Sequence, residues 1–261
     1  MDLKTARLSK RERWERILAR LNSDVTVRIS ALAEQFGVTT ETIRRDIDEL
    51  TDQGLVSRTY GGAASRSLTA EPALLQRRER RIAERQQIAE LAAALIDPGD
   101  VVMIDAGSTT YQFARALAAR PIELTVLTNC LPIAQSLGGS TGVRVMMCPG
   151  LYVETENAVF GQEACAFLDR FQANKAVIGA GGITEASVTD ADVEAGWIKR
   201  RMIERADRAI LLLDHSKFDT RLFDTVCGLS DIDDLVSDDT PPKPIARALK
   251  AAAVAFHGPE G

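Results

Sequence analysis

The sequence predicts an α/β protein in two parts: an N-terminal winged helix-turn-helix, and then a mostly parallel α/β domain. Two patterns predict this. The first 64 residues hold helical segments, a glycine-containing turn and a short alternating segment. Further along, continuous apolar runs with the length of buried strands alternate with helical patterns, as in a sheet covered on both faces. We expect the domains at 9–64 and 89–256, with a linker and helix at 65–88.

Composition bounds the class of protein before any motif is considered. The chain has 261 residues, 45% of them hydrophobic, which suits one large or two smaller globular domains. Its four cysteines are far apart, and no apolar run resembles a signal peptide or a membrane span, so we expect a cytoplasmic protein with no membrane partner. Residues 1–66 hold 12 basic and 10 acidic residues, a weakly basic start to a chain of net charge −5.

The first 37 residues predict two helices and a turn. A stripe of apolar residues runs through 11–21, the first helix, and a β-prone piece follows at 25–27. Ser30 is expected to cap the second helix, 31–36. Gly37 comes next, where a tight turn favours a residue without a Cβ atom.

The third helix starts two residues later and has two chemically different faces. Ile43, Ile47 and Leu50 recur at helical spacing and form its buried stripe, and Thr39 stands at the N-cap position. The opposite face combines hydroxyls with two arginines, Arg44 and Arg45. A helix in the major groove of DNA needs such a face, because hydroxyls and guanidinium groups bind phosphates and base edges. A solvated amphipathic helix is the alternative.

A wing is predicted after this helix. Residues 55–60 alternate as a strand does, and Gly61, Gly62 and Ala63 form its turn. The wing carries Arg58 beside the third helix. A three-helix protein-interaction module is the competing interpretation, but the complete pattern favours DNA binding. The residues expected to contact DNA are Arg28, Thr39, Thr40, Thr42, Arg44, Arg45 and Arg58.

The stretch 33–47, with Thr-Ile-Arg-Arg-Asp at 42–46, resembles the winged helix of the DeoR family of bacterial transcriptional regulators. The segments at 54–58 and 61–63 extend this resemblance over nearly the whole N-terminal part. Thr39 and Tyr60 stand where the family often has Ser and His. The resemblance implies sequence-specific operator binding, usually by a repressor.

The region after the wing is expected to link the two domains. Glu71 and Pro72 mark a plausible boundary. The arginine-rich run 76–87 is interpreted as a solvated linker helix, although contact with the DNA backbone is an alternative. The apolar helix 88–96 is expected to pack on the second domain.

The second domain is predicted from alternating strands and helices. The expected strands are 101–104, 124–127, 143–147, 176–178, 209–213 and 235–236. The expected helices are 111–119, 131–137, 160–171, 194–208 and 245–256.

Polar loops follow four of these strands, at the edge where parallel sheets bind ligands. The loop 105–110 joins glycine and hydroxyls to a helix N-terminus, which suits a phosphate, although an ordinary turn with hydroxyl caps is the alternative. The other three loops begin at Thr128, Gly179 and Asp214, and the last of them carries Lys217. The glycines after 179 would let a ligand approach the backbone closely. Four such loops on one edge indicate a binding site.

These loops resemble the DeoR-family sensor domain, which is similar in fold to ribose-5-phosphate isomerase and glucosamine-6-phosphate deaminase. The resemblance implies that residues 107–110 hold a sugar phosphate, that Glu194 and Lys199 match polar positions of the family helix, and that Ser216–Lys217 matches an isomerase segment. A phosphorylated sugar or related metabolite is the implied effector. The residues expected to contact it are Asp105, Gly107, Ser108, Thr109, Thr110, Asn129, Gly181, Gly182, Glu194, Lys199 and Lys217.

Several observations favour a sensor over an enzyme. An aldose–ketose isomerase needs a carboxylate base. The aspartate-rich loop of the isomerases that this domain resembles would fall at about 177–183, and this segment contains no acid. Asp190, Asp192 and Glu194 could supply one, so a sugar-phosphate enzyme with an accessory DNA-binding domain is the rival hypothesis; otherwise we expect these acids to accept hydrogen bonds from the sugar or to be solvated. We expect no catalytic residues, cofactor or metal. The expected partners are double-stranded operator DNA, the effector and further copies of the chain, as a dimer or tetramer.

Overall fold

The computed structural model describes residues 8–23, 26–52, 56–59, 61–65, 74–79 and 81–259. For residues 22, 23, 57, 58, 64, 65, 75 and 76 it describes the backbone only. The chain forms two compact units, an N-terminal unit (Met1–Pro72) and a C-terminal unit (Ala73–Gly261). Each unit has its own core.

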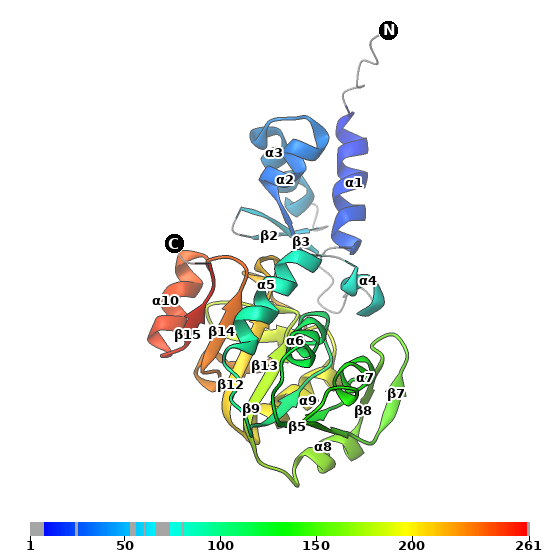
Figure 1. The fold of residues 1–261 in the computed structure, drawn as a ribbon. Helices are drawn as coiled ribbons and strands as arrows, with labels where there is room; N and C mark the ends of the chain where they lie inside the picture. The colour runs from blue at the N-terminus through cyan, green and yellow to red at the C-terminus, as the bar shows by residue number, and fades with distance from the viewer. Residues whose placement is uncertain are drawn as a thin grey trace. The chain divides into compact units, whose positions relative to one another are not determined.

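The N-terminal unit is a three-helix arrangement with a small antiparallel sheet, drawn in blue in Figure 1. The sheet has the order β1-β3-β2. Its elements are α1 (Lys10–Ser23), β1 (Thr26–Arg28), α2 (Ile29–Phe36), α3 (Thr40–Asp52), β2 (Val56–Thr59) and β3 (Gly62–Ser65). The predicted order of helix, strand, helix, turn, helix and wing is therefore present.

The turn between α2 and α3 depends on Gly37. Its backbone is left-handed, with φ 63° and ψ 36°, and the N–H of Val38 donates to the carbonyl of Ala33. The predicted cap at Ser30 is wrong: α2 begins at Ile29, Arg28 is the N-cap residue, and no side chain caps it. The helix starts earlier because β1 runs directly into it.

The core of this unit joins all three helices to the wing. Ile17 of α1, Leu32 of α2 and Ile47 of α3 are buried together with Val56 and other apolar residues. Gly62 makes the pairing of β1 with β3 possible, because a Cβ atom there would lie 1.9 Å from the carbonyl oxygen of Val27. The wing is thus part of the packed unit.

The C-terminal unit is built on seven strands in the order β15-β14-β12-β9-β4-β5-β6. All six pairings in this sheet are parallel. From β4 the chain goes to β5 and β6 in one direction, and from β9 it goes to β12, β14 and β15 in the other, so the strand order reverses between β4 and β9. The strands are β4 (Val101–Ile104), β5 (Leu124–Thr128), β6 (Val143–Met147), β9 (Ala173–Gly179), β12 (Ala206–Leu213), β14 (Asp234–Ser237) and β15 (Ala255–His257).

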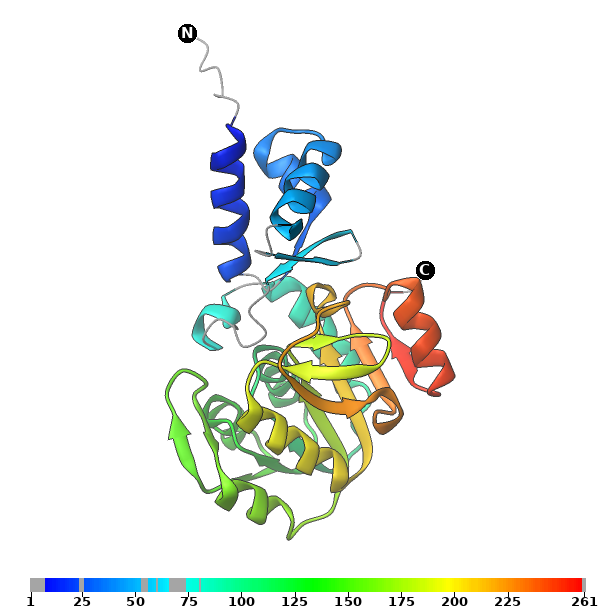
Figure 2. The ribbon, with the colours of Figure 1, turned by 180° about the vertical axis from the view of Figure 1, so that it is seen from behind.

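Helices cover both faces of this sheet. In Figure 1, α5 and α6 lie in front of it, and Figure 2 shows α9 on the opposite face. The helices are α4 (Leu74–Arg78), α5 (Ile82–Ala93), α6 (Ser108–Ala118), α7 (Leu131–Gly138), α8 (Gln162–Leu168), α9 (Val193–Glu204) and α10 (Lys243–Ala251).

Alternation along the strands produces two separate cores. Val102 and Ile104 of β4 pack with Phe113 and the other apolar residues of α5, α6 and α7. Met103, between them, packs on the other side with Ile198 and the apolar residues of α8, α9 and α10. A central parallel strand is apolar on both faces for this reason, which is why its sequence reads as a continuous apolar run.

Three predicted helices were too long, and local backbone geometry explains each one. Gly161 has φ 104°, so the segment 160–171 divides into a strand and α8. The segment 194–208 gives up its last residues to β12, which pairs with β9 from Ala206 onward. Ala253, with φ 61°, ends the third helix before β15.

Two small antiparallel sheets were missed. Their strands are two to five residues long, too short for a sequence period to be read. They are the pair β7 (Leu151–Val153) and β8 (Ala158–Phe160), and the sheet β10 (Gly182–Ile183), β11 (Ser187–Asp190) and β13 (Asp224–Gly228).

Candidate functional site

The N-terminal unit exposes one face of α3. The helix is capped as predicted: the N–H of Thr42 donates to Thr39 Oγ1 at 3.2 Å, and the two threonine hydroxyls lie 2.9 Å apart. Thr39 and Thr40 are exposed, and Thr42 is half-buried. Hydroxyls at the start of an exposed helix are available to phosphates or base edges.

The two arginines of α3 are held only loosely. The side chain of Arg45 is 77% exposed, with Nε 3.9 Å from Glu41 Oε1, and that of Arg44 is 51% exposed, with Nη1 3.3 Å from Glu41 Oε2. Exposed ion pairs of this kind contribute little to stability, so a DNA phosphate or a guanine can replace Glu41 at small cost.

Two further predicted DNA contacts lie outside α3. Arg28 ends β1 and is exposed. Arg58 lies on β2, and its side chain falls outside the described atoms, as does the whole of Tyr60. The strand places Arg58 on the wing, as predicted.

Asp46 of the signature segment is not part of the exposed face. It is 2% exposed, and its carboxylate accepts hydrogen bonds from Arg13 Nε at 2.6 Å, Arg13 Nη2 at 3.0 Å and Trp14 Nε1 at 3.2 Å. This carboxylate therefore anchors α3 to α1.

In the C-terminal unit, the four polar loops leave neighbouring strands at one edge of the sheet. They follow β12, β9, β4 and β5, which are consecutive in the sheet. The reversal of strand order lies between β4 and β9, and crevices at such points bind ligands in open α/β sheets. The structure therefore brings the predicted loops together at the place where a ligand is expected.

A buried ionic cluster occupies the reversal point. Asp105, at the end of β4, is 1% exposed and accepts a hydrogen bond from the N–H of Gly179 at 3.0 Å. Its other oxygen lies 2.8 Å from Nζ of Lys199, which also lies 3.3 Å from Asp190. Asp190, one of the three acids that could supply a carboxylate base, thus belongs to this cluster.

The charges in this cluster depend on one another. Burial lowers the pKa of Lys199, but the charges of Asp105 and Asp190 outweigh this effect and leave that pKa raised. Burial raises the pKa of Asp105, and Lys199 opposes the rise. The lysine is therefore charged, and it holds two carboxylates at the end of the sheet.

The loop at 107–110 forms the start of α6. Thr110 Oγ1 donates to the carbonyl of Asp105 at 2.9 Å, and a Cβ atom at Gly107 would lie 2.8 Å from that hydroxyl. Ser108 and Thr109 are also buried. The first N–H groups of a helix have no acceptor within it, so this end of α6 suits an anion.

Asn129, after β5, is fully buried, and only one of the two polar atoms of its side chain has a hydrogen-bond partner among the described residues. Its Nδ2 donates to the carbonyl of Val159 at 3.0 Å, while its Oδ1 has no partner among the described residues. Exchanging Nδ2 and Oδ1 of this amide would place two acceptors, Oδ1 and the carbonyl oxygen of Val159, against each other. The orientation of the amide is therefore fixed. A buried acceptor without a donor is rare, and it suits a ligand hydroxyl.

The structure gives Gly181 and Gly182 a reason in packing as well. A Cβ atom at Gly181 would lie 2.2 Å from Leu222 Cδ1, and one at Gly182 would lie 2.2 Å from the carbonyl oxygen of Thr220. The loop that holds Thr220 and Leu222 occupies the side of each glycine on which a Cβ atom would project. These glycines are needed for close packing of the backbone.

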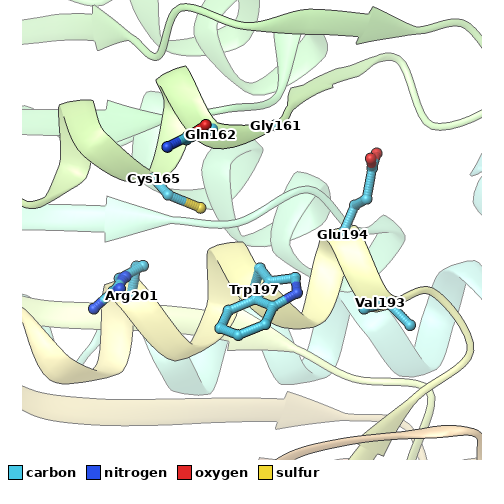
Figure 3. Close-up of a pocket in the computed structure, with 7 residues that line it drawn as sticks. All are labelled: Gly161, Gln162, Cys165, Val193, Glu194, Trp197 and Arg201. Carbon is cyan, nitrogen blue, oxygen red and sulfur yellow. The ribbon is translucent and has the colours of Figure 1, made fainter.

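Of the three acids at 190–194, Asp190 belongs to the Lys199 cluster, and Asp192 caps α9, accepting hydrogen bonds from the N–H groups of Glu194 and Ala195. Glu194 is exposed and lies apart from Lys199. Figure 3 shows Glu194 with Trp197 and Cys165 along a cavity of about 380 Å³ between α8 and α9. Lys199 does not line this cavity.

Lys217 belongs to a second cluster, centred on Asp214 after β12. Asp214 is 1% exposed and accepts hydrogen bonds from the N–H of Ser216 at 3.1 Å and its Oγ at 2.5 Å. Burial raises the pKa of Asp214, but Lys217, Arg85 and Arg81 outweigh it and bring that pKa to about 2. The carboxylate is therefore ionised at neutral pH.

Sequence reasoning missed Arg81 and Arg85 as members of this edge. Nη2 of Arg85 lies 3.2 Å from Asp214 Oδ2, and Nε of Arg81 lies 3.8 Å from its Oδ1. Both come from the segment expected to be a solvated linker, yet α4 and α5 belong to the C-terminal unit. The density of arginine was visible in the sequence, but the position of its counter-charge, 129 residues further on, was not.

Among the described residues, no group of three His, Cys, Asp or Glu side chains is placed to hold a metal ion. No helix within the described ranges is both long and apolar enough to cross a membrane.

Comparison with known families matches both units. Residues 13–69 match the family model of the DeoR-like helix-turn-helix domain, and residues 80–239 match that of the DeoR C terminal sensor domain. The second match alone covers more than half of the chain.

Whole-length relatives agree with these matches. The chain is 32% identical over 229 residues to the uncharacterized HTH-type transcriptional regulator YulB of Bacillus subtilis, covering 87% of this chain and 88% of the relative. It is 28% identical over 243 residues to the glycerol-3-phosphate regulon repressor of Escherichia coli, covering 93% and 96%. Among solved structures, ribose 5-phosphate isomerase A from Methanocaldococcus jannaschii matches 51% of this chain and 53% of its own, with 17% identity and a TM-score of 0.39.

Proposed function

The chain belongs to the DeoR family and is a DNA-binding transcriptional regulator; on that premise we propose that it represses an operon of carbohydrate metabolism and responds to a phosphorylated sugar or related metabolite. The response to a metabolite is supported by the position of the four polar loops at the reversal of strand order. One relative is named a repressor of a glycerol-3-phosphate regulon, which supports both the sign of regulation and a phosphorylated effector.

Operator recognition is assigned to the exposed face of α3 and to the wing. Arg44 and Arg45 exchange Glu41 for DNA, the hydroxyls of Thr39, Thr40 and Thr42 bind phosphate or base edges, and Arg28 and Arg58 add backbone contacts. A dimer or tetramer places two such faces on half-sites about 34 Å apart, or a multiple of that distance.

Effector recognition is assigned to the edge of the parallel sheet. The start of α6, residues 107–110, binds the phosphate, and Oδ1 of Asn129 accepts a bond from a sugar hydroxyl. The ion pair of Asp105 and Lys199 holds the end of β4 against α9 beside the ligand, and Glu194 and Lys217 are assigned further polar contacts with it.

The rival proposal of an isomerase is not favoured by the chemistry of the edge. Asp190, one of the acids that the sequence offered as a base, lies 3.3 Å from Nζ of Lys199, so its carboxylate is already engaged in an ion pair. Turnover of ribose-5-phosphate by the purified protein would revive the enzyme hypothesis.

The test is operator binding measured by fluorescence anisotropy. DNA from upstream of the protein's own reading frame should bind at least about a thousandfold more tightly than random duplex, the low end for specific recognition. Arg45→Ala should weaken that binding by about 1–3 kcal/mol if the guanidinium reads a base. Arg144→Ala, the same charge change at an exposed residue of β6, should leave it unchanged. Equal affinity for every duplex, with or without phosphorylated sugars, would refute the proposal.

A further inference from the structure

One strand of the C-terminal unit presents a free edge. β7 pairs with β8 in a two-stranded sheet, and in Figure 1 it lies on the outer side of that hairpin. Leu151 is 68% exposed and Tyr152 is 47% exposed, and Leu151 is the most exposed of the large apolar residues that the structure describes. An exposed apolar edge strand is a template for pairing with another chain, so proteins usually protect such edges with charges or cover them.

This edge has no protecting charges. Residues 145–153 and 157–162, which include both strands of the hairpin, contain no charged side chain. The chain beyond residue 66 is acidic, with 27 acidic and 20 basic residues. Two copies of such a chain repel each other, and an uncharged edge is a place where they can meet with little repulsion.

The backbone of Tyr152 points away from β8. Its partner in the register is Val159, whose N–H donates to the carbonyl of Asn129 at 2.8 Å and whose carbonyl accepts from Asn129 Nδ2 at 3.0 Å. Both backbone groups of Val159 therefore face away from β7, so Tyr152 and Val159 form a non-hydrogen-bonded pair of the ladder. The N–H and C=O of Tyr152 then point to the outer edge, where neither has a partner among the described residues.

The hairpin is held in a fixed position by the rest of the unit, although a hairpin alone is only marginally stable. Asn129 fastens β8 through the two hydrogen bonds above, and the N–H of Leu74 donates to the carbonyl of Thr155 at 2.9 Å. Val153 packs against the core of the C-terminal unit, and Leu151, two residues away, projects from the same face of the strand. The contacts thus fix an apolar strand edge and leave it uncovered.

We propose that β7 is a contact between two copies of the chain, which pair antiparallel about a two-fold axis at Tyr152. This inference rests on the dimer or tetramer proposed above. The two Tyr152 residues exchange their N–H and C=O hydrogen bonds, and the hairpins join into a four-stranded sheet of order β8-β7-β7-β8. Leu151 of each copy then lies opposite Val153 of the other, on the face that already packs on the core.

A second copy of the chain is the partner that this edge fits. A two-fold antiparallel contact is self-complementary, and it needs on its axis one residue whose N–H and C=O both point outward, as those of Tyr152 do. In this register Glu154 lies opposite Gly150 of the other copy, so the acids that follow the strand are kept apart. Helix-turn-helix dimers bind paired half-sites, which also calls for a second copy.

The register is tested by cysteine cross-linking of the full-length protein with oxidised glutathione. Tyr152→Cys places two thiols on directly opposite residues, whose Cα atoms are about 5.5 Å apart, within the range of a disulfide. Leu151→Cys is the matched control, because its Cα lies diagonally from its own copy, about 7–8 Å away. Tyr152→Cys should form disulfide-linked dimer at least about tenfold faster than Leu151→Cys or the natural protein with its four cysteines.

Sedimentation equilibrium without DNA tests the contact itself. Leu151→Lys places a charge that is solvated in the single copy and buried when two copies pair. It should raise the dissociation constant at least about tenfold and remove one step of assembly, from tetramer to dimer or from dimer to monomer. Phe223→Lys, the same change at a residue that is 59% exposed, should assemble as the natural protein does. Both variants should keep the Tm of the natural protein's C-terminal unit.

Tyr152→Pro isolates the backbone hydrogen bond. It removes an N–H that no described residue accepts, at an edge position that tolerates proline. It should assemble more weakly than Tyr152→Val, which also loses the ring but keeps the N–H.

The proposal is overturned if the natural protein is monomeric at micromolar concentration, if Leu151→Lys assembles as Phe223→Lys does, or if cysteine at 151 cross-links as fast as at 152. Assembly of the natural protein that Leu151→Lys leaves intact refutes this contact alone. Equal affinity for every duplex refutes the proposed function instead, so the two failures are distinct.

Discussion

Asp46 shows how one carboxylate organises the DNA-binding unit. It lies in the middle of the arginine-rich signature segment but faces inward, where Arg13 and Trp14 of α1 bind it. Arg44 and Arg45, its neighbours in sequence, point to the exposed side. Three consecutive residues of α3 therefore have two roles: Asp46 anchors the helix to α1, while Arg44 and Arg45 are exposed and available to DNA.

Asp46→Ala should destabilise the N-terminal unit by about 3 kcal/mol, because it leaves the guanidinium of Arg13 largely buried without its partner. Thermal unfolding followed by tryptophan fluorescence in a Trp197→Phe background, which leaves Trp14 as the one tryptophan, measures the loss. Glu34→Ala, a change at an exposed acid of α2, should cost almost nothing. Equal stability of the two variants would mean that Arg13–Asp46 is not an anchor.

Asp214 makes a prediction about acid stability. Its pKa is lowered from 3.8 to about 2 in the folded protein, so its contribution is present above pH 4 and is lost as the pH falls through 2. The contribution corresponds to about 2 kcal/mol. Urea unfolding of the natural protein and of Asp214→Asn, followed between pH 5 and pH 2, should show a difference that shrinks over this window. A constant difference would contradict the assignment.

The elements show what a sequence can predict and what it cannot. The strands 101–104 and 143–147 and the turn at Gly37 were predicted correctly, because continuous apolar runs and a glycine between helices are local signals. The sheet β10-β11-β13 was missed because its pairing joins Val188 to Cys227, far apart in sequence. The same limit hid the partners of Lys199 and Arg85 in the candidate site.

The wing depends on one close approach between strands. Gly62→Ala would place a methyl group against the backbone of Val27, which cannot retreat without breaking the pairing of β1 and β3. The expected loss of stability is about 2 kcal/mol or more, together with a loss of operator affinity. Gly138→Ala, at a position with nothing within 4 Å, serves as the control, measured by the same denaturation curves. An unperturbed Gly62→Ala protein would show that the wing packs differently.

At the scale of the whole molecule, separate cores predict separable unfolding. The two units do not share a hydrophobic cluster among the residues described. Scanning calorimetry should therefore resolve two transitions, one for each unit.

Lys199→Met should lower only the transition of the C-terminal unit, by about 3–5 kcal/mol, because Asp105 and Asp190 lose their buried cation. Adding Asp105→Asn to Lys199→Met should recover part of the loss, since one of the two unpaired charges is removed. If Lys199→Met lowered both transitions together, the chain would unfold as one cooperative body.

The reversal of strand order between β4 and β9 has a consequence for protein engineering. The loops that follow β4 and β9 lie past the ends of the strands, while the apolar residues that hold the sheet pack in two cores on its faces. Side chains of these loops that stand outside the buried ionic clusters can be exchanged with little disturbance to the framework. A biosensor for a different metabolite could be selected from a library confined to those positions, with the promoter as reporter.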